Sequence, residues 1–323
     1  MSNVGGGLLL YIHQSVCINQ KNSAHSPDDD RPCTARGRMK PAPFRYHAPK
    51  TIDEAVETLA EVAVEDGRVL AGGQSLVPIM AFRLARPAHL VDINGVEALK
   101  RLAVEGGKLC IGACVRHAAF HKPVVEGPLG RLLATVVRHI AHYPIRTRGT
   151  FCGSVAHADP ASEWCLVVAA LDGEMVARST AGTRVIPAQE FFQGIMSTAL
   201  KEDELLTEVR LPLLPADTHC GFYEFSRRAG DFALAMAVAT YRIRDGLMTE
   251  PRVAIGSVEP QPRRIAQAEN ALAGQMPGPA AFEAAADAVA RAVDPLDDII
   301  TGAEYRRDLS RTITRRALER AAP

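Results

Sequence analysis

The chain has 323 residues, of which 47% are apolar and 23% charged, and its 37 basic side chains balance 37 acidic ones. This balance argues against a nucleic-acid binder or an acidic disordered chain, and the apolar content suffices for two or three compact units. No run approaches the ~18–20 apolar residues of a membrane-spanning helix. The seven cysteines are scattered without C-x2-C spacing, which indicates free thiols in a reducing cytoplasm.

Residues 1–38 differ from the rest of the chain. They contain a triple glycine, three successive aspartates and little periodic apolar surface. We expect this stretch to be disordered or to be an artefact of gene-start assignment, with a genuine flexible tail as the alternative. A regular pattern of apolar residues begins at Met39, and prolines 212 and 215 mark a second change in the sequence pattern. The sequence therefore predicts one domain over residues 39–215 and another over 217–323.

The predicted elements of the first domain mix helices with short strands. Thr51 and Glu54 form a capping box that opens an amphipathic helix, and Gly67 ends it. A short strand at 69–71 runs into a Gly-Gly turn. Further strands are expected at 89–93, 99–104, 108–113, 174–178, 184–186 and 205–211, and helices at 129–142, ended by Tyr143-Pro144, and 160–171.

The second domain is predicted to combine antiparallel strands with helices. Strands are expected at 221–227, 234–244 and 252–258, and helices at 263–273, 280–293 and 303–321. The last helix carries arginines 306, 307, 311, 315, 316 and 320 beside several acidic residues, which favours a solvated face over a partner site. This unit belongs to the α+β class.

Two glycine-rich turns are the main candidates for chemistry, because neither G-x-G-x-x-G nor G-x-x-x-x-G-K-[ST] occurs. The first is LAGGQSLV (70–77). The second is RTRGTFCGS (146–154), which leads into the predicted helix that carries Glu163. Glycines let consecutive backbone N–H groups converge on an anion, so the two turns together could hold the two phosphates of a dinucleotide. A plain tight turn is the alternative for either one.

Five sequence motifs resemble the FAD-binding medium subunit of molybdenum hydroxylases, the group of xanthine dehydrogenase and aerobic carbon monoxide dehydrogenase. They are KPAPFRYHAPKTIDEAVETLAE, AGGQSLVPIMAFRLARPAHLVDIN, IRTRGTFCGSVAHADPASEW, FYEFSRRAGDFALA and DDIITGAEYRRDL. The resemblance implies an α+β fold. A two-subdomain FAD-binding domain of the vanillyl-alcohol oxidase (PCMH) type would precede a smaller C-terminal domain of antiparallel sheet and helices.

The resemblance also implies which residues bind FAD. The first pyrophosphate loop would be Ala71, Gly72, Gly73, Gln74 and Ser75, with Leu70, Leu76 and Val77 at its edges. The second would be Thr150, Phe151, Cys152, Gly153 and Ser154, with Cys152 where the family usually has glycine. Glu163 would accept bonds from cofactor hydroxyls. Ile140, Leu206 and Tyr223 would lie near the cofactor, although core packing explains such residues equally well.

Other constellations are weaker. His139, His142 and His157 lie close to the second turn, but His139 and His142 differ by three positions and lack a third metal ligand at convincing spacing. Cys110 with Cys114 cannot alone hold an iron–sulfur cluster. We therefore predict no metal site and assign no catalytic acid, base or nucleophile.

The function implied by the resemblance is electron transfer in a heteromeric oxidoreductase. A large molybdopterin subunit would hydroxylate the substrate, a small [2Fe-2S] subunit would relay electrons, and this chain would collect them on FAD for NAD, quinone or oxygen. Neither a nucleic acid nor a membrane span is expected. The alternatives are a self-sufficient flavin oxidoreductase and a binding module that has lost its flavin.

Overall fold

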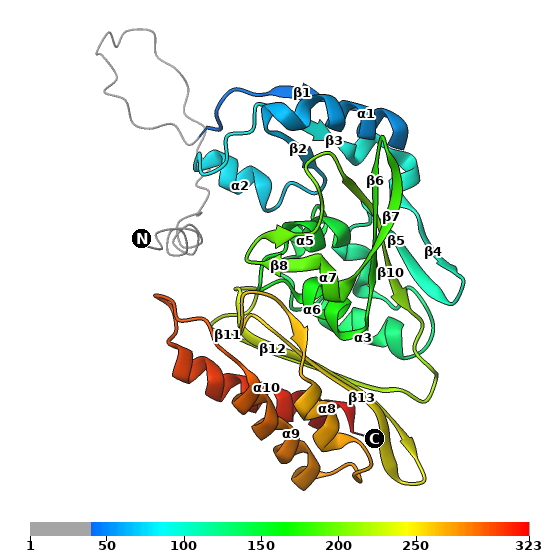
Figure 1. Ribbon diagram of the computed structural model, residues 1–323, viewed down its shortest axis with the longest axis vertical. Helices are drawn as coiled ribbons and strands as arrows, with labels where there is room; N and C mark the ends of the chain where they lie inside the picture. The colour runs from blue at the N-terminus through cyan, green and yellow to red at the C-terminus, as the bar shows by residue number, and fades with distance from the viewer. Residues whose placement is uncertain (1–39, 323) are drawn as a thin grey trace, which may run out of the picture.

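The computed structural model describes residues 40–322, so the expectations for residues 1–38 lie outside the described part. Of the four sheets in the described residues, the three larger ones follow one another along the molecule (Figure 1). A small sheet with helices α1 and α2 lies at one end, a five-stranded sheet occupies the middle, and a four-stranded sheet with helices α8–α10 forms the other end. The chain thus combines separate helices and sheets, as the α+β expectation requires.

The first sheet is parallel. Its order is β1 (Arg45–His47), β3 (His89–Asp92) and β2 (Gly67–Leu70). Helix α1 (Ile52–Val62) buries Ala55, Val56 and Leu59. The Thr51 hydroxyl accepts a bond from the Glu54 N–H at 3.1 Å, and the Glu54 carboxylate accepts one from the Lys50 N–H at 2.7 Å. The predicted capping box is confirmed, with its reciprocal bond one residue earlier.

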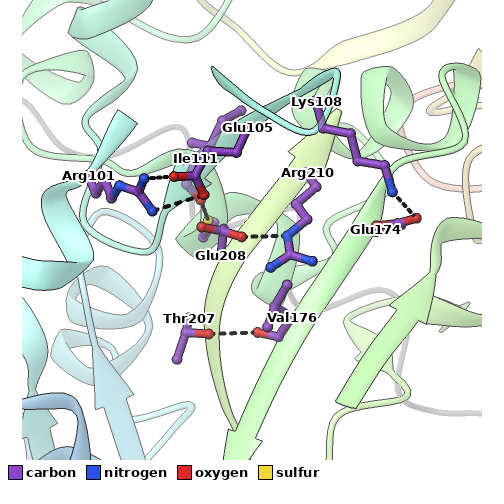
Figure 2. A network of polar contacts seen from close by, with 10 residues as sticks. Arg101, Glu105, Lys108, Ile111, Glu174, Val176, Thr207, Glu208 and Arg210 are labelled. Carbon is purple, nitrogen blue, oxygen red and sulfur yellow. Dashed lines mark hydrogen bonds and ion pairs between the residues drawn. The ribbon is translucent and has the colours of Figure 1, made fainter. Parts of the chain in front are cut away.

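The five-stranded sheet is antiparallel throughout. Its order is β4 (Leu102–Glu105), β5 (Lys108–Gly112), β10 (Leu205–Pro212), β6 (Glu174–Ser179) and β7 (Gly182–Pro187). Charged pairs follow its strands (Figure 2), among them Lys108 with Glu174 and Arg210 with Glu208, both at 2.6 Å. Thr207 lies at a break in the β10–β6 register, where its hydroxyl donates to the Val176 carbonyl at 3.0 Å.

The helices around this sheet differ from the predicted ones. Helix α3 (Pro128–Val136) ends well before His142, and Tyr143-Pro144 begins α4 (Tyr143–Arg146) instead of stopping a helix. Proline is compatible with the first turn of a helix because it needs no N–H partner there. The Arg146 guanidinium donates to the carbonyls of Ile140 and Ala141 at 2.7 and 2.9 Å. These bonds provide hydrogen-bond partners for the backbone carbonyls in the segment after α3.

Two further helices lie between this sheet and the four-stranded one. Helix α6 (Glu163–Ala170) begins three residues later than the predicted Pro160, because the Ser162 hydroxyl caps it. Helix α5 (Phe151–His157) was not predicted at all. The remaining short elements are α2 (Leu76–Ala81), α7 (Ala188–Phe191), β8 (Phe192–Gly194), β9 (Ser197–Thr198) and the 3-10 turns Ala63–Glu65, Ile93–Gly95, Glu97–Lys100 and His117–His121.

The C-terminal sheet has the order β11 (His219–Ser226), β12 (Ala233–Arg244), β13 (Leu247–Gly256) and β14 (Arg263–Arg264). Helices α8 (Ala266–Leu272), α9 (Pro279–Ala292) and α10 (Ala303–Ala321) cover one face of it (Figure 1). Met236, Val238 and Ala254 on the other face join the core that contains Trp164 of α6. Residues 233–241 of β12 are all buried, because both faces of this strand are covered.

The arginines of α10 only partly form the predicted solvated face. The Arg306 side chain is 4% exposed, pairs with Asp298 at 2.7 Å and donates to the Ser257 carbonyl. A buried guanidinium needs such hydrogen-bond and ion-pair partners. Because these partners lie outside the helix, the sequence of the helix alone did not indicate that Arg306 is buried. Over residues 40–322, no helix is long and apolar enough to cross a membrane.

Candidate functional site

The first glycine-rich turn follows the end of β2, and we call residues 71–75 loop 1. The Asn94 side chain donates to the Ala71 carbonyl at 2.6 Å, and the Gln74 side chain donates to the Gly72 carbonyl at 3.1 Å. Gly73 adopts a φ of +70°, which favours glycine. Leu76 and Val77, expected at the loop edge, form the first turn of α2.

The second glycine-rich turn, residues 146–154, is here called loop 2, and its residues 151–154 are helical. Thr150 is the N-cap of α5, and its hydroxyl accepts a bond from the Gly153 N–H at 3.0 Å. The Phe151 N–H donates to the Val115 carbonyl at 3.0 Å. The expectation of a glycine-rich turn was wrong for residues 151–154, because the Thr150 cap and the burial of Phe151 specify the start of a helix. The backbone N–H groups of Phe151 and Gly153 therefore already have hydrogen-bond partners within the protein.

The two loops touch. A Cβ atom on Gly72 would lie 2.5 Å from the Arg148 carbonyl oxygen and 2.6 Å from the Gly149 Cα. A Cβ atom on Gly153 would lie 2.6 Å from the Thr150 hydroxyl oxygen and 3.7 Å from the Ala71 Cβ. Side chains at either glycine would therefore separate loop 1 from loop 2 or disturb the cap of α5.

A cavity of about 380 Å³ opens beside the contact between the loops. Four of the predicted residues line it: Ala71, Cys152, Gly153 and Leu206. Its lining also includes Arg68, Met196, Ser197, Thr198 and Lys201, which sequence reasoning missed. The mixture of apolar walls with a few polar groups is typical of cofactor sites. Its size and its glycine-lined edge fit part of a dinucleotide such as FAD.

Glu163 lies next to loop 2. The hydroxyls of Ser154 and Ser162 are 2.8 Å apart, and Ser162 caps the helix that Glu163 begins. Burial raises the pKa of Glu163 to about 8, and Asp159 adds to this effect. At neutral pH a protonated Glu163 can donate a hydrogen bond as well as accept one, which modifies the expected carboxylate role.

A second buried acid, Glu224 of β11, lies close enough to interact electrostatically with Glu163. Burial, with a contribution from Glu163, raises the pKa of Glu224 to about 9. Its Oε2 atom is 3.8 Å from the His139 Nδ1 atom and has no hydrogen-bond partner within the described chain. The C-terminal domain therefore adds a buried carboxyl group to the region around Glu163.

Tyr223 lies on the opposite side of β11 from this region, because neighbouring strand residues point to opposite faces. The guanidinium carbon of Arg320 lies 4.5 Å from the centre of its ring, and that of Arg316 lies 5.3 Å away. The structure does not bring Tyr223 to the cavity. Ile140 is buried in the core, and its carbonyl accepts the bond from Arg146.

The histidines and cysteines near the loops have structural contacts. The Trp164 indole N–H donates to the His117 Nδ1 atom at 2.9 Å, and burial lowers the pKa of His117 to about 3. Cys110, Cys114 and Cys152 are buried free thiols. The Cys152 thiol donates to the Ile111 carbonyl at 3.2 Å. Between residues 40 and 322, no three potential ligand side chains are placed to hold a metal ion.

Comparison with known proteins agrees with this geometry. Residues 42–214 match the family of FAD binding domains in molybdopterin dehydrogenase, and residues 221–321 match the C-terminal domain of CO dehydrogenase flavoproteins. The chain therefore belongs to the FAD-binding medium subunits of the molybdenum hydroxylase family and is the flavoprotein subunit of an oxidoreductase.

Individual relatives match along nearly their whole length. The chain is 38% identical to the nicotine 6-hydroxylase medium subunit of Paenarthrobacter nicotinovorans over 88% of its own length and 99% of that protein. It is 34% identical to the carbon monoxide dehydrogenase medium chain of Hydrogenophaga pseudoflava, over 88% and 98%. A solved carbon monoxide dehydrogenase from that organism superimposes with a TM-score of 0.83 at 35% identity, covering 87% of this chain and 98% of its own.

A solved enzyme with another named substrate matches equally well. Quinoline 2-oxidoreductase from Pseudomonas putida 86 superimposes with a TM-score of 0.82 at 35% identity, covering 88% of this chain and 98% of its own. The resemblance stated from the sequence is confirmed, together with the two-part fold class.

Proposed function

We propose that this chain holds FAD without a covalent bond and transfers electrons within a larger complex. The observation that carries the proposal is the contact between loop 1 and loop 2 at the edge of the 380 Å³ cavity. When bound, FAD supplies a centre that accepts electrons singly and releases them as a pair.

The residues of the chain would bind and orient this cofactor. Ala71, Gly72 and Gly73 would let the backbone approach the pyrophosphate closely. Cys152, Gly153 and Leu206 would line the nucleotide part, because they line the cavity. Glu163 would contact cofactor hydroxyls from its place beside Ser154.

The proposed partners are suggested by relatives that are named as medium subunits or medium chains. We propose a small subunit with [2Fe-2S] clusters as the electron donor and a large molybdopterin subunit as the site of substrate oxidation, with NAD, quinone or oxygen as the final acceptor. The five described cysteines are free thiols, which supports a reducing cytoplasmic setting. A self-sufficient flavin oxidoreductase remains the competing proposal.

Rapid mixing separates the two proposals. The FAD-loaded chain is mixed with its chemically reduced [2Fe-2S] subunit, and flavin absorbance near 450 nm is followed. We expect flavin bleaching at a rate that rises with the concentration of the small subunit and far exceeds the rate with an unrelated reduced ferredoxin. Equal rates with both donors would contradict the proposal. Bleaching by an organic substrate without any partner would favour the self-sufficient enzyme.

A further inference from the structure

The contact between loop 1 and loop 2 is accompanied by a chain of hydrogen bonds through one arginine. Arg116 lies just before the 3-10 turn His117–His121 and forms an isolated β-bridge with Thr150. One terminal nitrogen of its guanidinium, Nη1, donates to the Arg148 carbonyl. This is the carbonyl whose oxygen faces Gly72 of loop 1.

The other terminal nitrogen of Arg116 reaches toward loop 1. Its Nη2 atom donates to the Asn94 side-chain oxygen at 2.5 Å. The amide nitrogen of the same Asn94 side chain donates to the Ala71 carbonyl at 2.6 Å and to the Asp92 carboxylate at 2.5 Å. A guanidinium group has its donors in a fixed planar fork, so it can hold two acceptors at a set separation.

We infer that Arg116, acting through Asn94, is a positioning residue that fixes the distance between the two FAD loops before the cofactor arrives. This inference rests on the proposed FAD-binding function. Without Arg116, the Arg148 carbonyl and the Asn94 side chain would each lose a charge-assisted partner, and loop 1 could move away from loop 2. The cofactor would then have to reassemble its own site, which weakens binding.

The test compares FAD affinity in three variants of the full-length chain with affinity in the wild type. R116M removes both donors, and R116K keeps the charge but not the fork. N94A removes the Asn94 bonds to Arg116, Ala71 and Asp92 but leaves the Arg148 carbonyl its Arg116 partner. The matched control is R242M, because Arg242 also joins two partners, Asp217 at 3.0 Å and Glu250 at 2.9 Å, but lies in the C-terminal domain. Affinity is measured by fluorescence titration, and the melting temperature of the FAD-free protein is recorded in parallel.

We expect FAD affinity to fall ten- to a hundredfold in R116M and less in R116K, while R242M binds like the wild type. A further variant, R116A, leaves room for free guanidinium. Low millimolar guanidinium should restore part of the FAD affinity of R116A, which a general loss of stability would not allow. The double variant R116M/N94A should bind no more weakly than R116M, because both substitutions cut the same connection.

Three results would overturn the inference. They are wild-type affinity in R116M, a loss in R242M as large as in R116M, or fully additive losses in R116M/N94A. Should R116M fail to fold, N94A decides, with unchanged affinity counting against the inference and a tenfold loss in its favour. A folded wild-type protein that takes up no FAD would instead refute the proposed function, and that result is seen before any variant is needed.

Discussion

The two proposed FAD loops obtain their shape in different ways. Loop 2 is held by the hydrophobic core. Thr150 caps α5, and Phe151 packs on Trp164 with ring centres 4.6 Å apart. Loop 1 is half-buried or exposed along residues 71–75, and polar side chains such as Asn94 and Gln74 hold its backbone. Substitutions in loop 2 should therefore act through packing, whereas those in loop 1 should act through backbone freedom and contact with loop 2.

The largest effect is expected where the two loops meet. Gly72→Val should abolish measurable FAD binding, because its Cβ would overlap the Arg148 carbonyl, and should cost roughly 1–3 kcal/mol of folding stability. FAD titration and urea unfolding measure the two quantities. Gly278→Val is the matched control, since nothing lies within 4 Å of a Cβ there. Equal FAD affinity in both variants would show that the loops do not need their contact.

Stability should also depend on pH through the acids beside loop 2. Glu163, with a pKa of about 8, holds its proton more tightly in the folded state than in the unfolded one. Its stabilisation is complete below its ordinary pKa of about 4.5 and is lost as the pH rises through 8. One such group changes the free energy of unfolding by at most about 1.4 kcal/mol per pH unit.

Urea unfolding between pH 5 and 9 tests this effect. Glu163→Gln should flatten the decline in stability, whereas the exposed control Glu304→Gln should leave it unchanged. On the acid side His117 acts in the opposite sense. Its lowered pKa means that its stabilisation is present above about pH 6.5 and is lost as the pH falls toward 3. A decline as steep in Glu163→Gln as in the wild type would refute the assignment.

A moderate effect is expected from backbone strain in loop 1. Gly73→Ala should lose about 1–2 kcal/mol of folding stability, because an L-residue is strained at a φ of +70°. FAD should also bind more weakly. Gly274→Ala has nearly the same φ, +75°, in open space of the C-terminal domain. It should lose similar stability but keep full FAD affinity, and a matching loss of affinity would argue against a specific role for loop 1.

The smallest effect on FAD is expected at Cys152. Cys152→Gly restores the residue usual in the family and should bind FAD at least as well as the wild type. It should nevertheless lose about 1 kcal/mol of stability, since glycine disfavours α5 and the buried thiol loses its bond to Ile111. Thermal melting with and without FAD distinguishes the two effects. A strong loss of FAD would mean that the thiol itself contributes to binding.

Local patterns predicted much of the fold. The capping box at Thr51 and most strands of the two antiparallel sheets were predicted, because each is specified by neighbouring residues. Strand β14 was missed, because its residues were assigned to the helix that begins only at Ala266. Helix α5 was missed because its TFCGS start looks like a turn. The cap at Thr150 and the burial of Phe151 decide its conformation, and burial depends on the tertiary structure.

The candidate site shows the same limit. The resemblance identified the loops, but the link from Arg116 to Asn94 spans 22 residues and left no local pattern. The sequence LVDIN at the end of β3 was the one pattern that could have indicated a role for Asn94, because its polar residues come at the end of a buried strand. The orientation of Tyr223 and Glu224 depends on which face of β11 packs against α3 and which against α10, and the strand pattern alone did not decide this.

Titration of the purified, cofactor-free chain with FAD tests the central claim most directly. We expect saturation at about one FAD per chain, a yellow protein after gel filtration, and release of the chromophore by acid precipitation. Circular dichroism confirms that the sample is folded. A folded protein that remains colourless after reconstitution would contradict the account of the two loops as an FAD site.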